Sequence, residues 1–301
     1  MRLKTLLQSA TAVIAIALAT PSPVYAKDTT PVVATFSILG DLVREIGGKH
    51  IALTTLVGPD GDAHVYKPTP ADARAVSGAK VLFVNGLDFE GWINRLVDAS
   101  DFKGTRVVAT EGIEAIPLGA DDDHGAFDPH AWQSAENIVI YVDNITAALA
   151  KADPSSASKF FENRTKYVAK VKALDADISA RMKALPEAAR TVITSHDAFG
   201  YFAKRYGLNF EAPQGMSTES EASAKDVAAL ITQIRKEKIR AVFVETITDN
   251  RLMEQIVRET GAKIGGTLYS DALSGADGPA GTYLDMMRHN SSTILGVLTG
   301  T

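Results

Sequence analysis

The sequence predicts an α/β protein of two similar lobes with mainly parallel sheets, joined by one long helix. Three observations support this. Short β-branched or apolar runs alternate with helical patterns, which is typical of parallel sheets. Segments 33–47 and 81–84 match segments 193–207 and 241–244 at one common offset, which indicates a repeated lobe. A long helical pattern then separates the two copies.

The first lobe is expected over residues 27–153. Its loop 58–64 is rich in turn-forming Gly, Pro and Asp, and a second long loop covers 117–128. The periodicity of apolar residues predicts its strands and helices. In chain order they are strand 31–36, helix 38–46, strand 51–57, helix 72–77, strand 81–84, helix 92–99, strand 106–109 and helix 134–150.

The connecting helix is expected over residues 154–185. Asp153-Pro154 interrupts the preceding helical pattern, because proline cannot continue a helix interior. At the rise of an α-helix the connector would be roughly 40 Å long. The second lobe is expected over 186–301. Its elements are strand 191–194, helix 198–206, helix 226–236, strand 241–245, helix 251–260, strand 264–269 and helix 282–298.

The N-terminus, residues 1–26, is expected to be a signal peptide. Arg2 and Lys4 precede an apolar run that is too short to span a bilayer comfortably, and small residues then end at Ala26. The chain contains no cysteine, so neither disulfides nor a lipid on an N-terminal cysteine is expected. We therefore expect an exported chain in the periplasm, cleaved after about Ala26, with no lipid anchor.

The composition limits the kinds of partner. The formal net charge is −5, which argues against nucleic acid. The hydrophobic content of 46% is enough for a sizeable core. Without thiolates, a transition-metal site in this chain would have to use histidine and carboxylate.

Four residues stand where ligands bind in open α/β sheets, beyond the carboxyl ends of strands. They are His64, His130, His196 and Asp271, two from each lobe. Three imidazoles and one carboxylate make a four-coordinate site for a divalent metal. Each residue alone also fits an ordinary role in a surface loop, at a helix start, at a strand end or as a helix cap. Topology alone leaves both interpretations open.

Several stretches, in this order, resemble the periplasmic metal-binding proteins of zinc and manganese ABC importers. The resemblance implies that His64, His130, His196 and Asp271 bind the metal in a cleft between the lobes. It also implies a membrane permease as partner and no catalytic activity. A monomer, loaded in the periplasm by a zinc chaperone, is the expected state. The stretches are GDAHVYKPTP (61–70), DPHAW (128–132), HDAFGYF (196–202), FVET (243–246), LYSDAL (268–273) and TYLDMM (282–287).

The identity of the metal depends most on His196. Members similar to manganese binders often carry Glu there, and zinc binders carry His. Three imidazoles also suit Zn²⁺ better than Mn²⁺, which prefers oxygen ligands. We therefore expect zinc as the transported ligand, with a manganese-binding homologue as the alternative. We also expect His196→Glu to shift preference toward Mn²⁺, and affinity to fall below about pH 6.5 as the imidazoles protonate.

A secreted zinc hydrolase is a further alternative. The chain lacks H-E-x-x-H and G-x-S-x-G, which argues against it. Glu245, at the end of a strand, is expected either to orient a ligand imidazole or to accept from nearby backbone amides. An acidic loop replaces the long His-rich loop of many zinc members, and it is either solvated or a mobile capture site. Its residues are Asp121, Asp122, Asp123 and His124.

Overall fold

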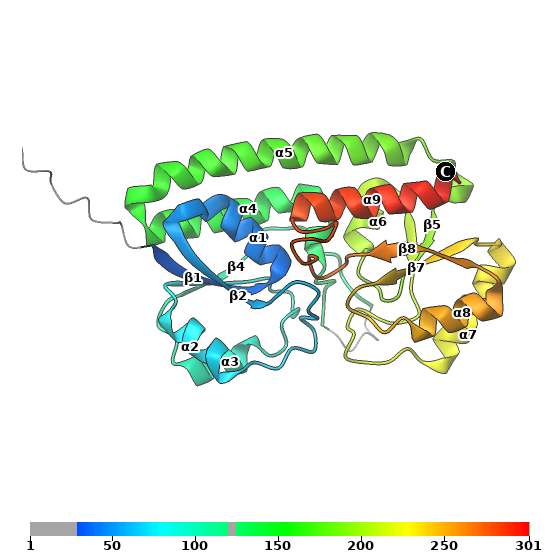
Figure 1. Cartoon of the computed structure of the whole chain (residues 1–301), viewed down its shortest axis with the longest axis horizontal. Coiled ribbons are helices and arrows are strands. Elements are labelled where there is room, and N and C mark those ends of the chain that lie inside the picture. The colour runs from blue at the N-terminus through cyan, green and yellow to red at the C-terminus, as the bar shows by residue number, and fades with distance from the viewer. Residues whose placement is uncertain (1–28, 120–124, 301) are drawn as a thin grey trace, which may run out of the picture.

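The computed structural model describes residues 29–119 and 125–300. The expected signal peptide and the acidic residues Asp121–His124 lie outside this part of the chain. Two lobes stand side by side under one long helix, α5 (Ala157–Lys183), which passes over both of them (Figure 1). The predicted fold class is confirmed. Within the described ranges, no helix has the length and apolar character needed to cross a membrane.

The first lobe is built on one four-stranded parallel sheet in the order β2-β1-β3-β4. The three carboxyl-terminal residues of β1 are buried, so the loops that follow the sheet start from a rigid edge. Among the residues that the structure describes, four α-helices and two short 3₁₀ helices complete the lobe. The elements are β1 (Thr30–Phe36), α1 (Ser37–Gly47), η1 (Gly48–His50), β2 (Ile51–Val57), α2 (Pro70–Gly78), β3 (Val81–Val84), α3 (Ile93–Ser100), β4 (Thr105–Val108), η2 (Ala131–Gln133) and α4 (Ala135–Ala152).

The start of α2 anchors the loop that carries His64. Thr69 and Asp72 form a capping box, and Pro70 occupies the first turn, where a missing N–H costs nothing. The Asp72 carboxylate also accepts the Tyr66 hydroxyl proton at 2.8 Å. The motif 61–70 is thus fixed at its far end by local hydrogen bonds.

The second lobe contains two pairs of parallel strands, β5-β6 and β7-β8. In each pair, the first strand is followed by a helix and then by the parallel partner strand, as in the first lobe. The expected helix over 198–206 begins only at Gly200. The connector and lobe comprise η3 (Pro154–Ser156), α5, η4 (Glu187–Ala189), β5 (Thr191–Ile193), α6 (Gly200–Tyr206), β6 (Asn209–Glu211), α7 (Ala224–Glu237), β7 (Ala241–Glu245), α8 (Arg251–Thr260), β8 (Lys263–Leu268) and α9 (Tyr283–Thr299).

The apolar core is continuous from the first lobe into part of the second. It includes α1, α4, the buried face of α5, α6 and α9. A smaller, separate cluster lies in the outer part of the second lobe, under α7 and α8, and contains Ile193, Leu230 and Ile256. The inner part of the second lobe is therefore packed firmly against the first, and its outer part has a core of its own.

Candidate metal centre

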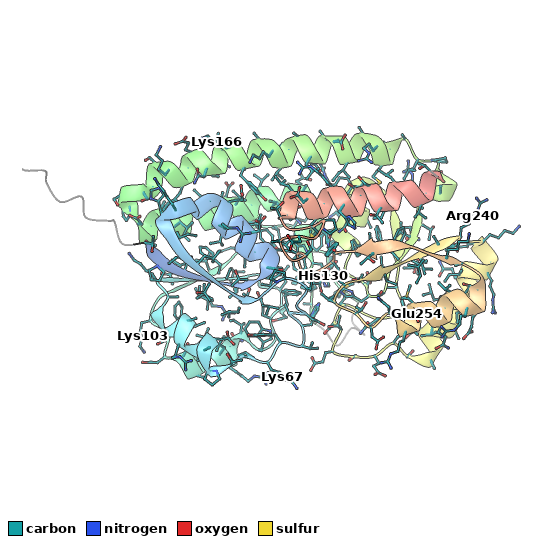
Figure 2. All side chains as sticks on the ribbon, viewed as in Figure 1. Lys67, Lys103, His130, Lys166, Arg240 and Glu254 are labelled. Carbon is teal, nitrogen blue, oxygen red and sulfur yellow. The ribbon has the colours of Figure 1, made fainter. Side chains whose placement is uncertain are left out.

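Four loops bring the predicted residues together between the lobes. His64 follows β2, His130 immediately precedes η2, His196 follows β5, and Asp271 follows β8. Each offers one ligand atom, and these atoms all lie within 4.8 Å of one another. His130 lies in the middle of the molecule, whereas charged residues such as Lys103 and Lys166 lie on its outside (Figure 2).

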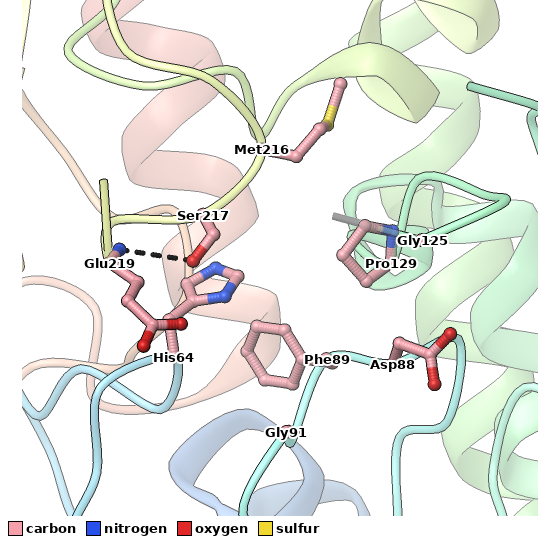
Figure 3. Close-up of a pocket in the computed structure, with 9 residues that line it drawn as sticks. All are labelled: His64, Asp88, Phe89, Gly91, Gly125, Pro129, Met216, Ser217 and Glu219. Atoms are coloured by element: carbon pink, nitrogen blue, oxygen red, sulfur yellow. Dashed lines mark hydrogen bonds between the residues drawn. The ribbon is translucent and has the colours of Figure 1, made fainter. Parts of the chain in front are cut away.

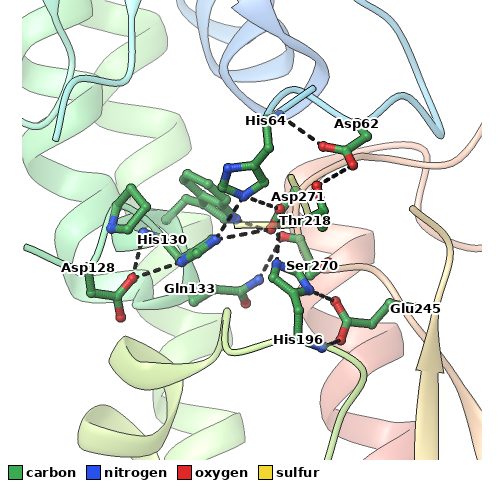
Figure 4. A network of polar contacts seen from close by, with 12 residues as sticks. Asp62, His64, Asp128, His130, Gln133, His196, Thr218, Glu245, Ser270 and Asp271 are labelled. Atoms are coloured by element: carbon green, nitrogen blue, oxygen red, sulfur yellow. Dashed lines mark hydrogen bonds and ion pairs between the residues drawn. The ribbon is translucent and has the colours of Figure 1, made fainter. Parts of the chain in front are cut away.

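The distances between the facing atoms match the edges of one coordination polyhedron. His64 Nε2 and His196 Nε2 lie 3.1 and 3.3 Å from Asp271 Oδ2. His130 Nε2 lies 3.4 Å from His64 Nε2 and 3.8 Å from Asp271 Oδ1. A tetrahedral ion with bonds of 2.0–2.1 Å would separate its ligand atoms by about 3.3–3.4 Å. The four side chains are spaced as the ligands of a single ion would be (Figure 4).

Two buried carboxylates set the orientation of two of the imidazoles. Asp128 Oδ1 lies 2.8 Å from His130 Nδ1, and Glu245 Oε2 lies 2.6 Å from His196 Nδ1. A carboxylate at Nδ1 keeps the proton on that nitrogen and leaves Nε2 to face the centre. Glu245 Oε1 also accepts from the backbone N–H groups of Ser195 and His196, at 2.8 and 2.9 Å.

Asp62 and Asp128, which the sequence suggests only as turn residues beside two of the histidines, play parallel parts. Each precedes a histidine of the centre by two residues and accepts that histidine's backbone N–H at 2.9 Å. This is the local turn that a short aspartate side chain forms with its own backbone. A D-x-H pattern that occurs twice, at 62–64 and 128–130, is the sequence signal of this shared role.

Aromatic rings and backbone contacts hold the other sides of the centre. The Phe89 ring lies 4.8 Å from the His64 ring, and the Trp132 ring lies 5.3 Å from the His130 ring, between centroids. Trp132 Nε1 and Gln133 Nε2 both donate to the carbonyl of Ser270, at 2.8 and 2.7 Å. The residue before Asp271 is therefore fixed by the first lobe.

Burial and charge act against each other in this centre. Burial lowers the pKa of His64. Burial also works to lower the pKa of His196, but the carboxylates of Glu245 and Asp271 outweigh it and raise this pKa well above the usual value. Burial works to raise the pKa of Asp271, yet His196 and His130 hold it well below its usual range. The centre thus keeps a charged carboxylate in the interior.

The donor set fits a divalent cation. Both oxygens of Asp271 and Nε2 of His196 are buried and make no hydrogen bond of good geometry within the described part of the chain. Buried polar atoms without partners are costly, because they have lost their hydrogen bonds to water. A cation among them would satisfy all three atoms at once.

A cavity of about 340 Å³, called the access cavity below, lies beside the centre and is lined by His64. The His64 side chain is 5% exposed, whereas those of the other three residues are 0% exposed. Figure 3 shows His64 and Phe89 inside this cavity, with Ser217 and Glu219 on one side and Asp88 on the other. Among the four residues, His64 is thus the one that borders this cavity.

The family profile described as "Zinc-uptake complex component A periplasmic" matches residues 32–296. The chain belongs to this family. Its members are metal-binding, substrate-binding proteins of ABC transporters, and the expected resemblance is confirmed at that level.

Individual members of the family carry the names of different metals. The iron-binding protein YfeA of Yersinia pestis is 35% identical over 263 residues, which cover 87% of this chain and 84% of YfeA. The manganese-binding lipoprotein MntA of Bacillus subtilis (strain 168) is 34% identical over 272 residues, 89% of each chain. The periplasmic zinc-binding protein TroA of Treponema pallidum superimposes with a TM-score of 0.84 at 30% identity, covering 90% of this chain and 99% of TroA.

These names correct one expectation. MntA and other relatives are lipoproteins, which contradicts the prediction of an exported chain with no lipid anchor. That prediction rested on the lack of cysteine and on the apparent N-terminal signal. Neither observation anticipated the lipid anchor that the names of these relatives state.

Proposed function

We propose that this chain captures Zn²⁺ with His64, His130, His196 and Asp271 and delivers it to the membrane permease of an ABC transporter. The observation that carries the proposal is the convergence of three imidazole nitrogens and one carboxylate on a single point. Three nitrogen donors and one oxygen donor are a set that favours zinc over metals that prefer oxygen.

The same geometry supports binding rather than catalysis. A catalytic zinc keeps an open position for water or substrate, whereas four protein donors close the coordination. His130, His196 and Asp271 have 0% side-chain exposure, so a bound ion would have little room for a substrate.

Manganese is the second candidate. Asp271 directs Oδ2 toward His64 and His196 and Oδ1 toward His130, so the carboxylate could bind through both oxygens. A second oxygen donor would suit a harder ion that accepts more ligands. The relatives are named for iron, manganese and zinc. Their names therefore do not favour either Zn²⁺ or Mn²⁺ as the ion that this chain binds.

Metal content and competition test the proposal. The purified chain would be stripped with a chelator and titrated with Zn²⁺ and Mn²⁺, separately and together. We expect one Zn²⁺ per chain, which an excess of Mn²⁺ does not displace. Preferential binding of Mn²⁺ would support the second candidate. Binding of neither ion would contradict the assignment of all four ligands.

Binding is expected to release about one proton per ion near neutral pH. The raised pKa of His196 means that the metal-free protein holds this imidazole protonated, and an ion must displace the proton from Nε2. Apparent affinity should then rise about tenfold per pH unit until pH exceeds that pKa, which lies above the usual value near 6.5. The dependence should therefore extend to higher pH than the sequence alone predicted.

Calorimetry in buffers of different ionisation enthalpy measures this proton release directly. The buffer-dependent part of the binding enthalpy gives the number of protons released. A binding enthalpy independent of buffer near pH 7 would show that His196 is already neutral in the metal-free protein.

A further inference from the structure

Asp62 contacts both lobes on the side of the metal centre where His64 lies. Its Oδ1 accepts the backbone N–H of His64 at 2.9 Å, within the first lobe. Its Oδ2 accepts the hydroxyl proton of Thr218, which belongs to the second lobe, at 2.5 Å. One carboxylate therefore fixes the backbone of a metal ligand and joins it to the opposite lobe (Figure 4).

On the side of the centre where Asp271 lies, the contacts between the lobes are fully buried. Hydrogen bonds between buried residues join the segment that carries Asp271, and the start of α9 after it, to the first lobe. Trp132 and Gln133 donate to Ser270, and the backbone N–H of Tyr283 donates to Asp41 at 2.8 Å. These bonds lie in the continuous core, so this side of the interface is fixed.

Thr218 lies in an irregular segment outside the continuous core. It belongs to the segment 212–223, which leads from β6 to α7, and α7 packs in the separate apolar cluster of the outer second lobe. Thr218 and Asp62 are only half-buried, and both also line a second cavity of about 580 Å³. The bond between them thus ties the outer second lobe to the His64 loop at a solvent-accessible edge.

The segment around Thr218 also forms a wall of the access cavity. Met216, Ser217 and Glu219 line it, and Ser217 and Glu219 lie beside His64 (Figure 3). His64 is the member of the centre whose side chain reaches this cavity. Movement of the segment away from Asp62 would widen the route beside His64 and would free the carboxylate that positions its backbone.

We propose that the Asp62–Thr218 hydrogen bond is a latch that holds segment 212–223 over the access cavity and so sets how fast the metal ion leaves. Asp62 acts as a positioning residue for His64. This inference rests on the proposed function, because it takes His64 to be a metal ligand. Rupture of the bond should precede release of the ion to the permease.

Thr218→Val tests the latch, since it removes the hydroxyl and keeps the shape. The Zn²⁺-loaded protein would be mixed with an excess of a chromogenic chelator and the dissociation rate measured. We expect an increase of about tenfold, the effect of losing a hydrogen bond to a charged group. Thr218→Ser keeps the hydroxyl and should dissociate at close to the original rate.

Thr248→Val is the matched control. Thr248 lines the same second cavity, but its hydroxyl donates to the Glu245 carbonyl within its own lobe, at 3.4 Å. This variant should leave the dissociation rate unchanged. Circular dichroism of the metal-free protein should show both valine variants folded, so that a difference between their dissociation rates reports on metal release.

A double-mutant cycle with Asp62→Ala identifies the partner. In that background Thr218→Val should have no further effect on the dissociation rate, because its acceptor is gone. An equal acceleration in both backgrounds, or no acceleration in either, would overturn the latch. If the parent chain bound no Zn²⁺ at all, both the latch and the proposed function would fail. If it bound one Zn²⁺ tightly and Thr218→Val left the dissociation rate unaltered, the latch alone would be overturned.

Discussion

Replacing Asp271 by alanine is expected to weaken Zn²⁺ binding by more than about 100-fold. Structural zinc sites with four ligands bind with about 10–16 kcal/mol, so the mean share of one ligand is roughly 3 kcal/mol. Asp271 should account for at least that share, because it supplies the negative charge among three imidazoles and approaches each of them within 4 Å. Competition against a chelator of known affinity measures the loss.

Asp277→Ala provides the matched control for this prediction. Asp277 lies in the same segment between β8 and α9 but is exposed. The Asp277→Ala variant should bind Zn²⁺ as tightly as the parent chain does. Asp271→Asn keeps the shape and one carbonyl oxygen, so its loss should be smaller than that of alanine. Undiminished affinity in Asp271→Ala would mean that the ion binds somewhere else.

The candidate ligands could be predicted because each belongs to a local pattern. A β-branched run that ends in a polar residue and is followed by a helix predicts a strand end at the cleft, and His196 follows such a run. The same regularity predicts the alternation of strands and helices. The parallel pairings of β1 with β2 and β3 follow from it, since short connections through helices require them.

The rest depends on contacts that no local pattern encodes. β6 has three residues and a single fully apolar side chain, Phe210, so it shows no periodicity. The delayed start of α6 has a related cause. The backbone N–H of Asp197 donates to the carbonyl of Gln214 at 3.1 Å, which extends the β5-β6 pairing through His196 and leaves the helix to begin at Gly200. Pairing with a distant segment overrides the local helical preference.

The latch illustrates the same limit for the site. Thr218 and Asp62 are 156 residues apart in sequence, and neither lies in a periodic segment. Asp62 by itself predicts only a turn. Its second role exists because the folded lobes bring segment 212–223 against the loop 58–64, and such proximity can be seen only in the structure.

His196→Glu alone is not expected to produce a manganese-selective protein, although the sequence suggested that it would. His196 is fully buried with its Nδ1 only 2.6 Å from Glu245 Oε2. A glutamate at this position would place two carboxylates in one buried site, and like charges at that distance cannot both stay ionised. One would take up a proton, and binding of both Zn²⁺ and Mn²⁺ should fall by at least about tenfold.

His196→Glu combined with Glu245→Gln should give the switch. The amide oxygen of the introduced glutamine can still accept from the backbone N–H groups of residues 195 and 196, and its NH₂ group can donate to the new carboxylate. The centre then offers two imidazoles and two carboxylates, a harder donor set. We expect the ratio of Zn²⁺ to Mn²⁺ affinity to fall by about tenfold or more relative to the parent chain, measured by competition on the stripped protein.

Glu245→Gln alone separates the two contributions. It keeps all three imidazoles and removes only the charge behind His196, so both metals should bind about 10- to 100-fold more weakly with little change in their ratio. A ratio that shifts as far in this single variant as in the double variant would show that the charge at residue 245, and not the donor atom at residue 196, governs the choice of metal. An unchanged ratio in the double variant would place selectivity in the spacing of the other three ligands.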